Sequence, residues 1–175
     1  PGKTNREPTH AEIAEALRRS GMHNLALLPA QSAVSTCVAG VEIDVSSLAA
    51  GAAVDAAVDV LSRHGLRSFL VNGGGEIRVC SDGDKTWRIG IQIPEETARD
   101  SDYFHDRVIS LKEGSISTSG SYRNFHKFGS NVYVHIVDPR SGQPLQSDTV
   151  SVTTWAPDCT SADAWSTALF TLPAE

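Results

Sequence analysis

The sequence contains few cysteines, and they lack the spacing of a metal site or of a disulfide-rich protein. Cys37, Cys80 and Cys159 lie far apart, with no CxxC pair and no Cys–His ligand spacing. This pattern signals neither a zinc site nor a disulfide framework. We therefore expect three free thiols that are buried in the core.

Long apolar runs and clusters of positive charge are also missing. No stretch reaches the roughly 18 apolar residues that a membrane-spanning helix needs. The formal net charge is −6, and the lysines and arginines are scattered, which disfavours a nucleic-acid partner or wide contact with an anionic membrane. The chain begins PGKTNREP without Met or a signal peptide, so we interpret it as a processed form or a fragment.

The composition that remains is that of an ordinary globular protein. The chain has 175 residues, of which 40% are hydrophobic and 21% are charged. These values fit a folded protein with a core of its own rather than a disordered or fibrous one. The length favours a single domain over residues 1–175.

Helical and strand patterns occur in groups along the chain. Thr9 and Glu12 form a capping box before the first helix, and Gly65 is typical of the residue that closes the second. Helices are expected over residues 11–21, 46–64 and 160–170. Short strands are expected over 25–29, 35–45, 69–71, 76–80, 86–93, 108–111, 115–118, 132–137 and 150–155, with a hairpin turn at 81–85. This arrangement predicts an α+β fold of mixed, largely antiparallel sheets flanked by helices.

The segment TSADAWST, residues 160–167, places a carboxylate and a hydroxyl four positions apart. On a helix, Asp163 and Thr167 lie on one face, with Cβ atoms roughly 5–6 Å apart. A purely structural role is open, because Asp163 suits the first turn of a helix and Thr167 could face the core. The alternative is a hard-cation site, since these oxygens suit Mg²⁺, which commonly also binds substrate phosphates.

A second polar group marks a strand-to-helix junction in IDVSSLAAGAAVD, residues 43–55. Asp44 ends the strand, while Ser46 and Ser47 occupy the expected N-cap region, where free N–H groups favour anions. Capping explains one serine and one aspartate. It does not require all three polar residues together.

Three further stretches combine turn residues with polar side chains. VNGGGEI, residues 71–77, is either a tight turn or a place where another group approaches the backbone. STSGSYRNF, residues 117–125, is either a serine-rich loop or an anion-binding nest of backbone N–H groups. In HIVDPRSGQP, residues 135–144, a turn follows the strand, and His135 with Asp138 is either structural or part of a site.

Taken in order, these stretches resemble the ApbE family, the FAD:protein FMN transferases. IDVSSLAAGAAVD is similar to the family segment DLxxIAKGYAVD, VNGGGEI to NLGGDI, and STSGSYRNF to TSGDYRNF. HIVDPRSGQP is similar to HIIDPxTGxP, and SADAWSTALF to TADALATALF. Five matches in the same order cover residues 43–170, which makes coincidence improbable.

The resemblance implies a Mg²⁺-dependent enzyme with FAD as its substrate. Such an enzyme transfers FMN to a Thr or Ser hydroxyl of an acceptor protein and releases AMP. The implied metal ligands are Ser47, Asp163 and Thr167, and the implied catalytic residues are His135 and Asp163. The implied flavin contacts are Asp44, Ala50, Thr118, Ser119, Gly120 and Ile136.

Two departures from the family pattern keep alternatives open. The frequent Lys of the AKG segment is Ala50 here, which removes one cationic flavin contact. Family members usually carry an additional N-terminal portion, so residues 1–175 are interpreted as the C-terminal part of a longer domain. The alternatives are an FAD pyrophosphatase, with water as the attacking group, and a non-catalytic flavin-binding or assembly module.

The resemblance also implies partners and a location. Acceptors in the family are flavin-carrying subunits of membrane redox complexes, and no nucleic-acid partner is expected. Many members are lipoproteins that face the periplasm. A periplasmic location is therefore implied, with membrane tethering through a lipid anchor on the missing N-terminal portion.

Overall fold

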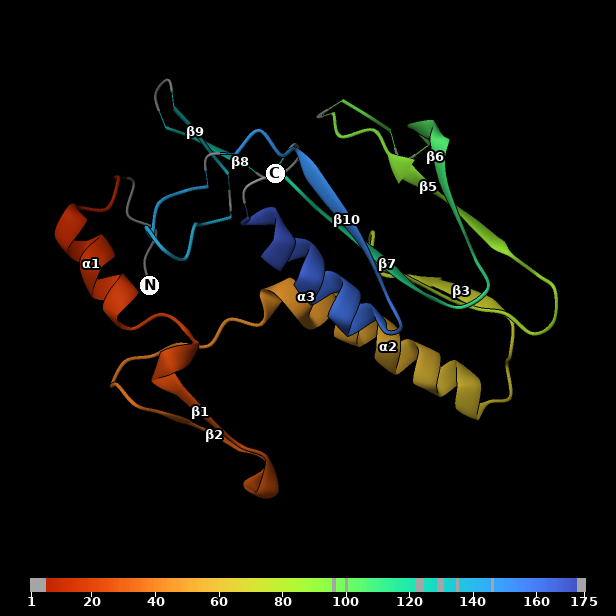
Figure 1. Cartoon of the computed structure of the whole chain (residues 1–175), viewed down its shortest axis with the longest axis horizontal. Helices are drawn as coiled ribbons and strands as arrows, with labels where there is room; N and C mark the ends of the chain where they lie inside the picture. The colour runs from red at the N-terminus through yellow and green to blue at the C-terminus, as the bar shows by residue number, and fades with distance from the viewer. Residues whose placement is uncertain are drawn as a thin grey trace. The chain divides into compact units, whose positions relative to one another are not determined.

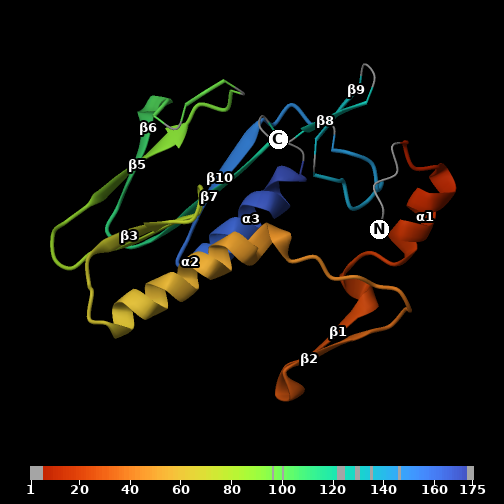
Figure 2. The same ribbon diagram turned by 180° about the vertical axis from the view of Figure 1, so that it is seen from behind.

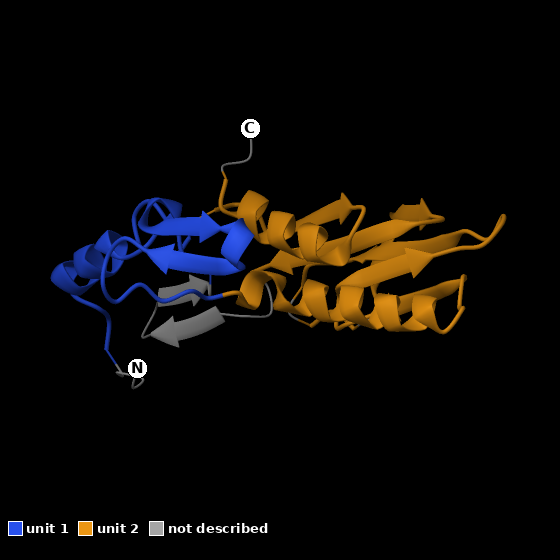
Figure 3. Cartoon of the chain, turned by 90° about the horizontal axis from the view of Figure 1, so that it is seen from below, with its two compact units in different colours: residues 1–44, 136–145 blue, residues 45–135, 146–175 orange. Residues whose placement is uncertain are grey.

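The computed structural model describes residues 6–95, 97–99, 101–121, 125–128, 131–134, 136–145 and 147–172. The chain divides into two compact units, which Figure 3 shows in different colours. Unit 1 comprises residues 1–44 and 136–145, and unit 2 comprises residues 45–135 and 146–175. None of the described helices is both long enough and apolar enough to cross a membrane.

Unit 1 begins with the capped helix that the sequence predicts. Helix α1 (His10–Arg18) follows Thr9, whose hydroxyl accepts a hydrogen bond from the Glu12 N–H at 3.3 Å. The Glu12 carboxylate accepts a bond from the Thr9 N–H at 2.8 Å, so the predicted capping box is confirmed. The remaining elements are η1 (Met22–Asn24), β1 (Leu25–Leu28), η2 (Pro29–Gln31) and β2 (Ala33–Thr36).

The second strand of unit 1 is shorter than the sequence pattern predicted. The prediction extended it over residues 35–45, but β2 ends at Thr36 and the structure shows no strand over residues 37–45. The reason is the length of its partner. β1 has four residues, and its antiparallel register already pairs its first residue, Leu25, with Thr36. The next N–H, that of Cys37, donates to the carbonyl of Asn24 at 2.8 Å, and Asn24 belongs to η1 rather than to a strand.

The segment 136–145 contributes a tight turn to unit 1. The Gly142 N–H donates to the Asp138 carbonyl at 2.8 Å, and the Asp138 N–H donates to the Gln143 carbonyl at 2.8 Å. Gly142 has a φ of +67° and lies against α1, where a Cβ would come within 2.8 Å of Ile13. The turn that the DPRSG sequence predicts is therefore confirmed.

Unit 2 is built on a four-stranded antiparallel sheet covered on one face by two helices. The strand order is β10-β7-β4-β3, and every neighbouring pair is antiparallel. Figures 1 and 2 show α2 and α3 side by side along this sheet. The bounds are α2 (Ser46–Arg63), β3 (Phe69–Asn72), β4 (Ile77–Cys80), β7 (Gly114–Gly120), β10 (Ser151–Ala156) and α3 (Cys159–Phe170).

Two apolar clusters hold unit 2 together, one on each face of the sheet. Between the sheet and the helices, Val54 and Val58 of α2 pack with Phe69 and Cys159. On the other face, Val79, Ile89 and Ile116 form a second cluster. Burying a side chain of this size stabilises the fold by roughly 1.5–3 kcal/mol, so these residues fix the layer order. The α+β fold with antiparallel sheets is confirmed.

The second cluster is completed by a hairpin of β5 (Trp87–Gln92) and β6 (Tyr103–Leu111), which pair antiparallel. Trp87 and Ile89 pack into this cluster, as the alternation of the sequence predicts. Another hairpin joins β8 (Phe125–Phe128) and β9 (Asn131–Val134), of which β8 was not predicted.

Two further expectations need correction. Residues 81–85 do not form a hairpin turn, because β4 pairs with β3 and β7 while β5 pairs with β6 in a separate sheet. The thiols are free, but only Cys159 is buried; Cys37 is exposed and Cys80 is intermediate. Cys37 follows directly after the last paired residue of β2 and is exposed within unit 1.

Candidate functional site

The candidate site lies where α2 and α3 come into contact. The Gly51 N–H of α2 donates a hydrogen bond to Asp163 Oδ2 of α3 at 2.9 Å, and this contact is buried. A Cβ at Gly51 would lie 2.5 Å from the Cys159 carbonyl oxygen and 2.9 Å from Asp163 Cβ. Only glycine permits this approach, which brings the carboxylate of α3 directly onto the backbone of α2.

The antiparallel register of the two helices extends from this contact toward Ser47. The Asp55 carboxylate accepts from the Cys159 N–H at 2.9 Å, and one turn along each helix Gly51 meets Asp163. Ser47 lies one turn before Gly51 on α2, and Thr167 lies one turn after Asp163 on α3. Of the three predicted metal ligands, Asp163 contacts α2 directly, while Ser47 and Thr167 lie on the adjacent turns of their own helices.

Burial shapes the electrostatics of Asp163. Asp163 is only 7% exposed, and this burial raises the pKa of its carboxyl above the ordinary value. The hydrogen bond from the Gly51 N–H lowers the pKa by a smaller amount. Glu76 shares this environment. Burial raises the pKa of Glu76, its own backbone N–H lowers it, and the charge of Asp163 raises it further.

Glu76 was not singled out by the sequence analysis, although it belongs to the stretch VNGGGEI. The Asn72 side-chain oxygen accepts from the N–H groups of Gly74 and Gly75, both at 3.0 Å, which folds the loop back. Gly73 packs on α2, where a Cβ would lie 2.6 Å from Val54. The stretch is therefore a tight turn in which Val54 also approaches the backbone at Gly73, and it brings a second carboxylate close enough to feel the charge of Asp163.

A group of hydroxyls links β7 to α3 beside Asp163. Ser119 Oγ lies 2.7 Å from Ser166 Oγ and 3.0 Å from Thr167 Oγ1, and Ser166 Oγ donates to the Asp163 carbonyl at 2.9 Å. Ser117 Oγ is 3.5 Å from Ser166 Oγ. Thr167 is thus oriented by β7, although the sequence pairs it only with Asp163.

The two sequence interpretations of residues 117–125, a serine-rich loop or an anion-binding nest, are both wrong for residues 117–120, while residues 122–124 lie outside the described residues. Residues 117–120 belong to β7, and they pair in register with residues 151–154 of β10. Extended backbone that is engaged in a sheet does not form the turn that a nest needs. Thr118 also points away from Ser119, because successive side chains alternate in a strand, and its hydroxyl lies 2.8 Å from that of Thr153.

The expected N-cap at Ser46 and Ser47 also needs correction. The N-cap of α2 is Val45, and no side chain caps the helix there. Ser46 and Ser47 are instead the first two residues of the helix, so their side chains lie on its first turn. Ser47 is exposed and lies one turn before Gly51.

The other predicted residues are placed as follows. Ala50 is half-buried on α2, next to Gly51. Asp44 is exposed and Ile136 is buried, and both belong to unit 1. His135 lies outside the described residues. The predicted roles of these residues stay predictions.

The donor set at the α2–α3 contact suits a hard cation. Asp163, Thr167 and Ser47 offer carboxylate and hydroxyl oxygens, which are the ligands that Mg²⁺ prefers. Within the described residues no group of three or more His, Cys, Asp and Glu side chains could hold a metal ion alone. Mg²⁺ is usually held by one or two carboxylates together with substrate phosphates, and these residues fit that mode.

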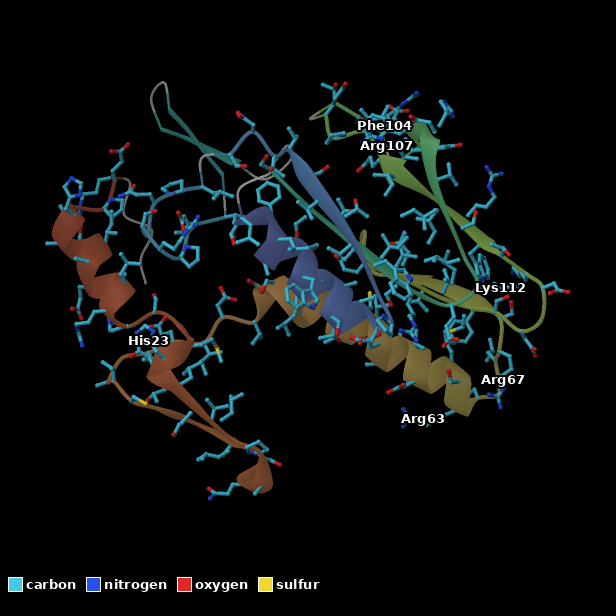
Figure 4. The ribbon with its side chains drawn as sticks, in the orientation of Figure 1. His23, Arg63, Arg67, Phe104, Arg107 and Lys112 are labelled. Atoms are coloured by element: carbon cyan, nitrogen blue, oxygen red, sulfur yellow. The ribbon has the colours of Figure 1, made fainter. Side chains whose placement is uncertain are left out.

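Several cations of unit 2 lie far from this contact. Figure 4 shows Arg63 at the C-terminal end of α2 and Arg67 just beyond it. The 12 residues from Gly51, which contacts Asp163, to Arg63 correspond to roughly 18 Å along the helix. At that distance, about two Debye lengths at physiological salt, the charge of Arg63 is largely screened at Asp163.

The sequence of this chain is similar to those of known flavin transferases. The model of the ApbE family matches residues 1–175. The chain is 31% identical over 172 residues to the FAD:protein FMN transferase of Klebsiella pneumoniae, covering 96% of this chain and 48% of that protein. It is 32% identical over 171 residues to that of Vibrio cholerae, covering 96% and 49%. The chain spans about half the length of the curated relatives it matches.

Solved structures show the same similarity. The ApbE protein of Thermotoga maritima superimposes with a TM-score of 0.80 at 35% identity, covering 95% of this chain and 52% of that one. The flavin transferase ApbE of Vibrio cholerae gives a TM-score of 0.80 at 29% identity, covering 99% and 54%. Both relatives therefore share the fold described above across nearly the whole chain.

Proposed function

The chain belongs to the ApbE family, and from this premise we propose that it supplies the metal-binding part of an FAD:protein FMN transferase. The proposed reaction moves FMN from FAD to a Thr or Ser hydroxyl of an acceptor protein and releases AMP. One observation carries the proposal. The buried carboxylate of Asp163 accepts a hydrogen bond from Gly51 of α2, and the Thr167 hydroxyl lies one turn further along α3, 3.0 Å from Ser119 Oγ.

In the proposed reaction, the acceptor oxygen attacks the phosphorus on the FMN side of the diphosphate. The new P–O bond forms as the bond to the AMP phosphate breaks, and the hydroxyl proton passes to a base. Mg²⁺, when bound, neutralises charge that develops on the phosphate oxygens. Asp163 would hold this ion together with Thr167 and Ser47, and the hydrogen bond from Gly51 keeps the carboxylate oriented.

We propose His135 as the base that accepts the proton of the acceptor hydroxyl. A metal-near carboxylate is the other candidate, and Glu76 fits that description, since its carboxyl feels the charge of Asp163. The proposed flavin contacts are those that the family positions imply: Asp44, Ala50, Thr118, Ser119, Gly120 and Ile136. Among them, Ser119 lies nearest to the proposed ligands, because its Oγ is 3.0 Å from Thr167 Oγ1.

The proposed acceptor is a flavin-carrying subunit of a membrane redox complex. The proposed location is the periplasm, with membrane tethering through a lipid anchor outside this chain. Labelling of fractionated cells with a flavin-fluorescence readout tests both points together. Covalent flavin on a membrane subunit that disappears when the gene is deleted would support them, and its persistence would contradict them.

One observation favours a second candidate function. Ala50 replaces the Lys that is frequent in the family, so a cationic flavin contact is lost and a non-catalytic flavin-binding module is the alternative. FAD hydrolysis uses the same ligands with water as the attacking group. We therefore test all three with the full-length protein, FAD, Mg²⁺ and an acceptor peptide containing Thr, followed by mass spectrometry and AMP detection.

The outcomes separate the candidates. FMN mass on the peptide with one AMP per transfer supports the transferase. AMP without modified peptide indicates the pyrophosphatase, and FAD that stays bound and intact indicates the binding module. No binding and no AMP would refute the proposal as a whole.

The metal ligand is tested by Asp163→Asn in the full-length protein. Asparagine keeps an oxygen for the Gly51 N–H, so the fold should persist, but the charge that holds the ion is lost. We expect AMP release to fall by at least about 100-fold, with little change in melting temperature. Asp59→Asn, an exposed position on α2, is the control and should retain activity. Full Mg²⁺-dependent activity in Asp163→Asn would show that the ligand set is wrong.

A further inference from the structure

Asp55 of α2 has no part in the proposed reaction, but its carboxylate accepts hydrogen bonds from the first turn of α3. Asp55 Oδ1 accepts from the Cys159 N–H at 2.9 Å. Asp55 Oδ2 accepts from the Thr160 N–H at 2.8 Å and from the Thr160 hydroxyl at 2.6 Å. Asp55 is therefore joined to α3 by three hydrogen bonds across 104 and 105 positions of sequence.

These bonds are not needed to begin the helix. α3 has its own N-cap, Asp158, whose carboxylate accepts from the Ser161 N–H at 2.7 Å and from the Ser161 hydroxyl at 2.9 Å. A local cap of this kind satisfies the usual requirement of a helix N-terminus. The contribution of Asp55 is thus to fix α3 against α2, because its partners lie on a different helix.

The charge on Asp55 is maintained by its surroundings. Burial raises the pKa of the carboxyl, but the bonds from Thr160 and Cys159 together with the charge of Arg78 outweigh it, so the pKa lies below its ordinary value. Arg78 belongs to β4, and its guanidinium also donates to Ser115 Oγ at 3.4 Å. Asp55 is therefore an ionised group held between the sheet and the positive end of α3.

The position of this contact matters for the candidate site. Cys159 and Asp163 are one turn apart on α3, and Asp55 and Gly51 are one turn apart on α2. Asp55 fixes the register of the two helices about 6 Å from the Gly51–Asp163 hydrogen bond. A small slip of α3 at its N-terminus would carry Asp163 away from Gly51.

We propose that Asp55 is a positioning residue, which sets the register of α3 so that Asp163 and Thr167 are presented to the metal ion. The metal part of this inference rests on the proposed function. The geometric part does not, because it concerns the Gly51–Asp163 bond of the protein itself. Residues that orient metal ligands in this way typically change metal affinity by 10–100-fold when they are removed.

The test compares Asp55→Asn with Asp59→Asn in the full-length protein. Both changes remove one carboxylate charge from α2, but Asp59 is exposed and one turn further along. In Asp55→Asn, one oxygen becomes an NH₂ group that cannot accept a bond from an α3 donor. We expect the Mg²⁺ concentration for half-maximal AMP release to rise about 10-fold, with a change below about 2-fold in the control.

Hydrogen exchange of the Gly51 amide provides the second measurement, and it needs neither metal nor substrate. We expect this amide to exchange about 10-fold faster in Asp55→Asn than in wild type, and unchanged in Asp59→Asn. Wild-type values for both the half-saturation and the exchange rate in Asp55→Asn would overturn the inference, even if the melting temperature had fallen. A merely stabilising residue would give that result.

A milder variant covers the case in which Asp55→Asn does not fold. Thr160→Val removes only the 2.6 Å hydroxyl bond and leaves both backbone bonds in place. It should shift both measurements in the same direction by a smaller factor, and no shift would overturn the inference. If wild-type protein releases no AMP, the proposed function fails, while the exchange of Gly51 still decides the role of Asp55.

Discussion

Gly51 is the residue at which the candidate site depends on the absence of a side chain. Two opposing effects act on an alanine there. Alanine is the better helix former, by roughly 1 kcal/mol. Its Cβ would, however, lie 2.5 Å from the Cys159 carbonyl oxygen and 2.9 Å from Asp163 Cβ, and both atoms belong to a packed helix. Overpacking of this kind typically costs 1–3 kcal/mol, so the steric effect should prevail.

Gly51→Ala is accordingly expected to lower the free energy of unfolding by up to about 2 kcal/mol, which is the overpacking cost less the gain of roughly 1 kcal/mol in helix propensity, measured by urea denaturation. Ala52→Gly, at the neighbouring exposed position, should lower it by about 1 kcal/mol through helix propensity alone. Opposite substitutions at adjacent positions would then both destabilise. A gain in stability for Gly51→Ala would mean that α2 and α3 do not approach each other as described.

For single residues, the sequence predicts which side chains belong to the candidate site but not which residues they contact. The spacing of Asp163 and Thr167 is local, and so it can be recognised from one helical turn. The contact of Asp163 with Gly51 joins residues 112 positions apart, and no local pattern encodes it. Glu76 was missed for the same reason, because only the packing of the glycine loop on α2 brings its carboxylate close to Asp163.

Among the elements, β7 shows how tertiary pairing overrides local composition. The sequence STSG is rich in serine and glycine, which is typical of a loop. In the structure, pairing with β10 extends the strand to Gly120. The alternation of the strand then sends Ile116 into the apolar cluster and the neighbouring serines, Ser115 and Ser117, to the buried polar face.

The polar face of β7 leads to a prediction for Ser119→Ala. This change removes hydroxyl contacts of 2.7 Å to Ser166 and 3.0 Å to Thr167, so Thr167 loses its orientation from the sheet. We expect a loss of about 1 kcal/mol in stability, the usual net value of one such bond. Half-saturation by Mg²⁺ should rise several-fold, toward the lower end of the roughly 10–100-fold range for orienting residues.

The matched control lies on the opposite face of the same strand pair. Thr153→Val removes the 2.8 Å contact with the Thr118 hydroxyl and keeps the shape of the side chain. It should change stability by a similar amount and leave the Mg²⁺ dependence as in wild type. Equal shifts in Mg²⁺ dependence for Ser119→Ala and Thr153→Val would show that the hydroxyls of β7 do not act through Thr167.

For the whole molecule, the fold class is predicted by the sequence but the strand order is not. Amphipathic helices and short alternating strands are local signals, and they indicate an α+β fold directly. The order β10-β7-β4-β3 depends on pairings such as Ile77 with Ile116, which are far apart in sequence. The division into two units likewise follows from contacts of residues 136–145 with the N-terminal segment.

The three thiols offer a test of the folded state as a whole. Cys37 is exposed and Cys80 is intermediate, while Cys159 is fully buried and packs with Val54, Val58 and Phe69. Burial, reinforced by the charge of Asp55, raises the pKa of the Cys159 thiol to about 12. The thiolate is the reactive form, so at pH 8 Cys159 should be almost inert both because it is protonated and because it is covered.

With a thiol reagent at pH 8, we expect Cys37 to react first and Cys159 to react only when unit 2 unfolds in urea. A Cys37→Ser/Cys80→Ser double variant isolates Cys159, so that its labelling rate reports the opening of the α2–α3 contact. If FAD and Mg²⁺ bind the folded state, mass action should slow this labelling by about 100-fold at 100 times their dissociation constant. Labelling of Cys159 at the rate of Cys37 in native protein would contradict the burial of the contact on which the candidate site is built.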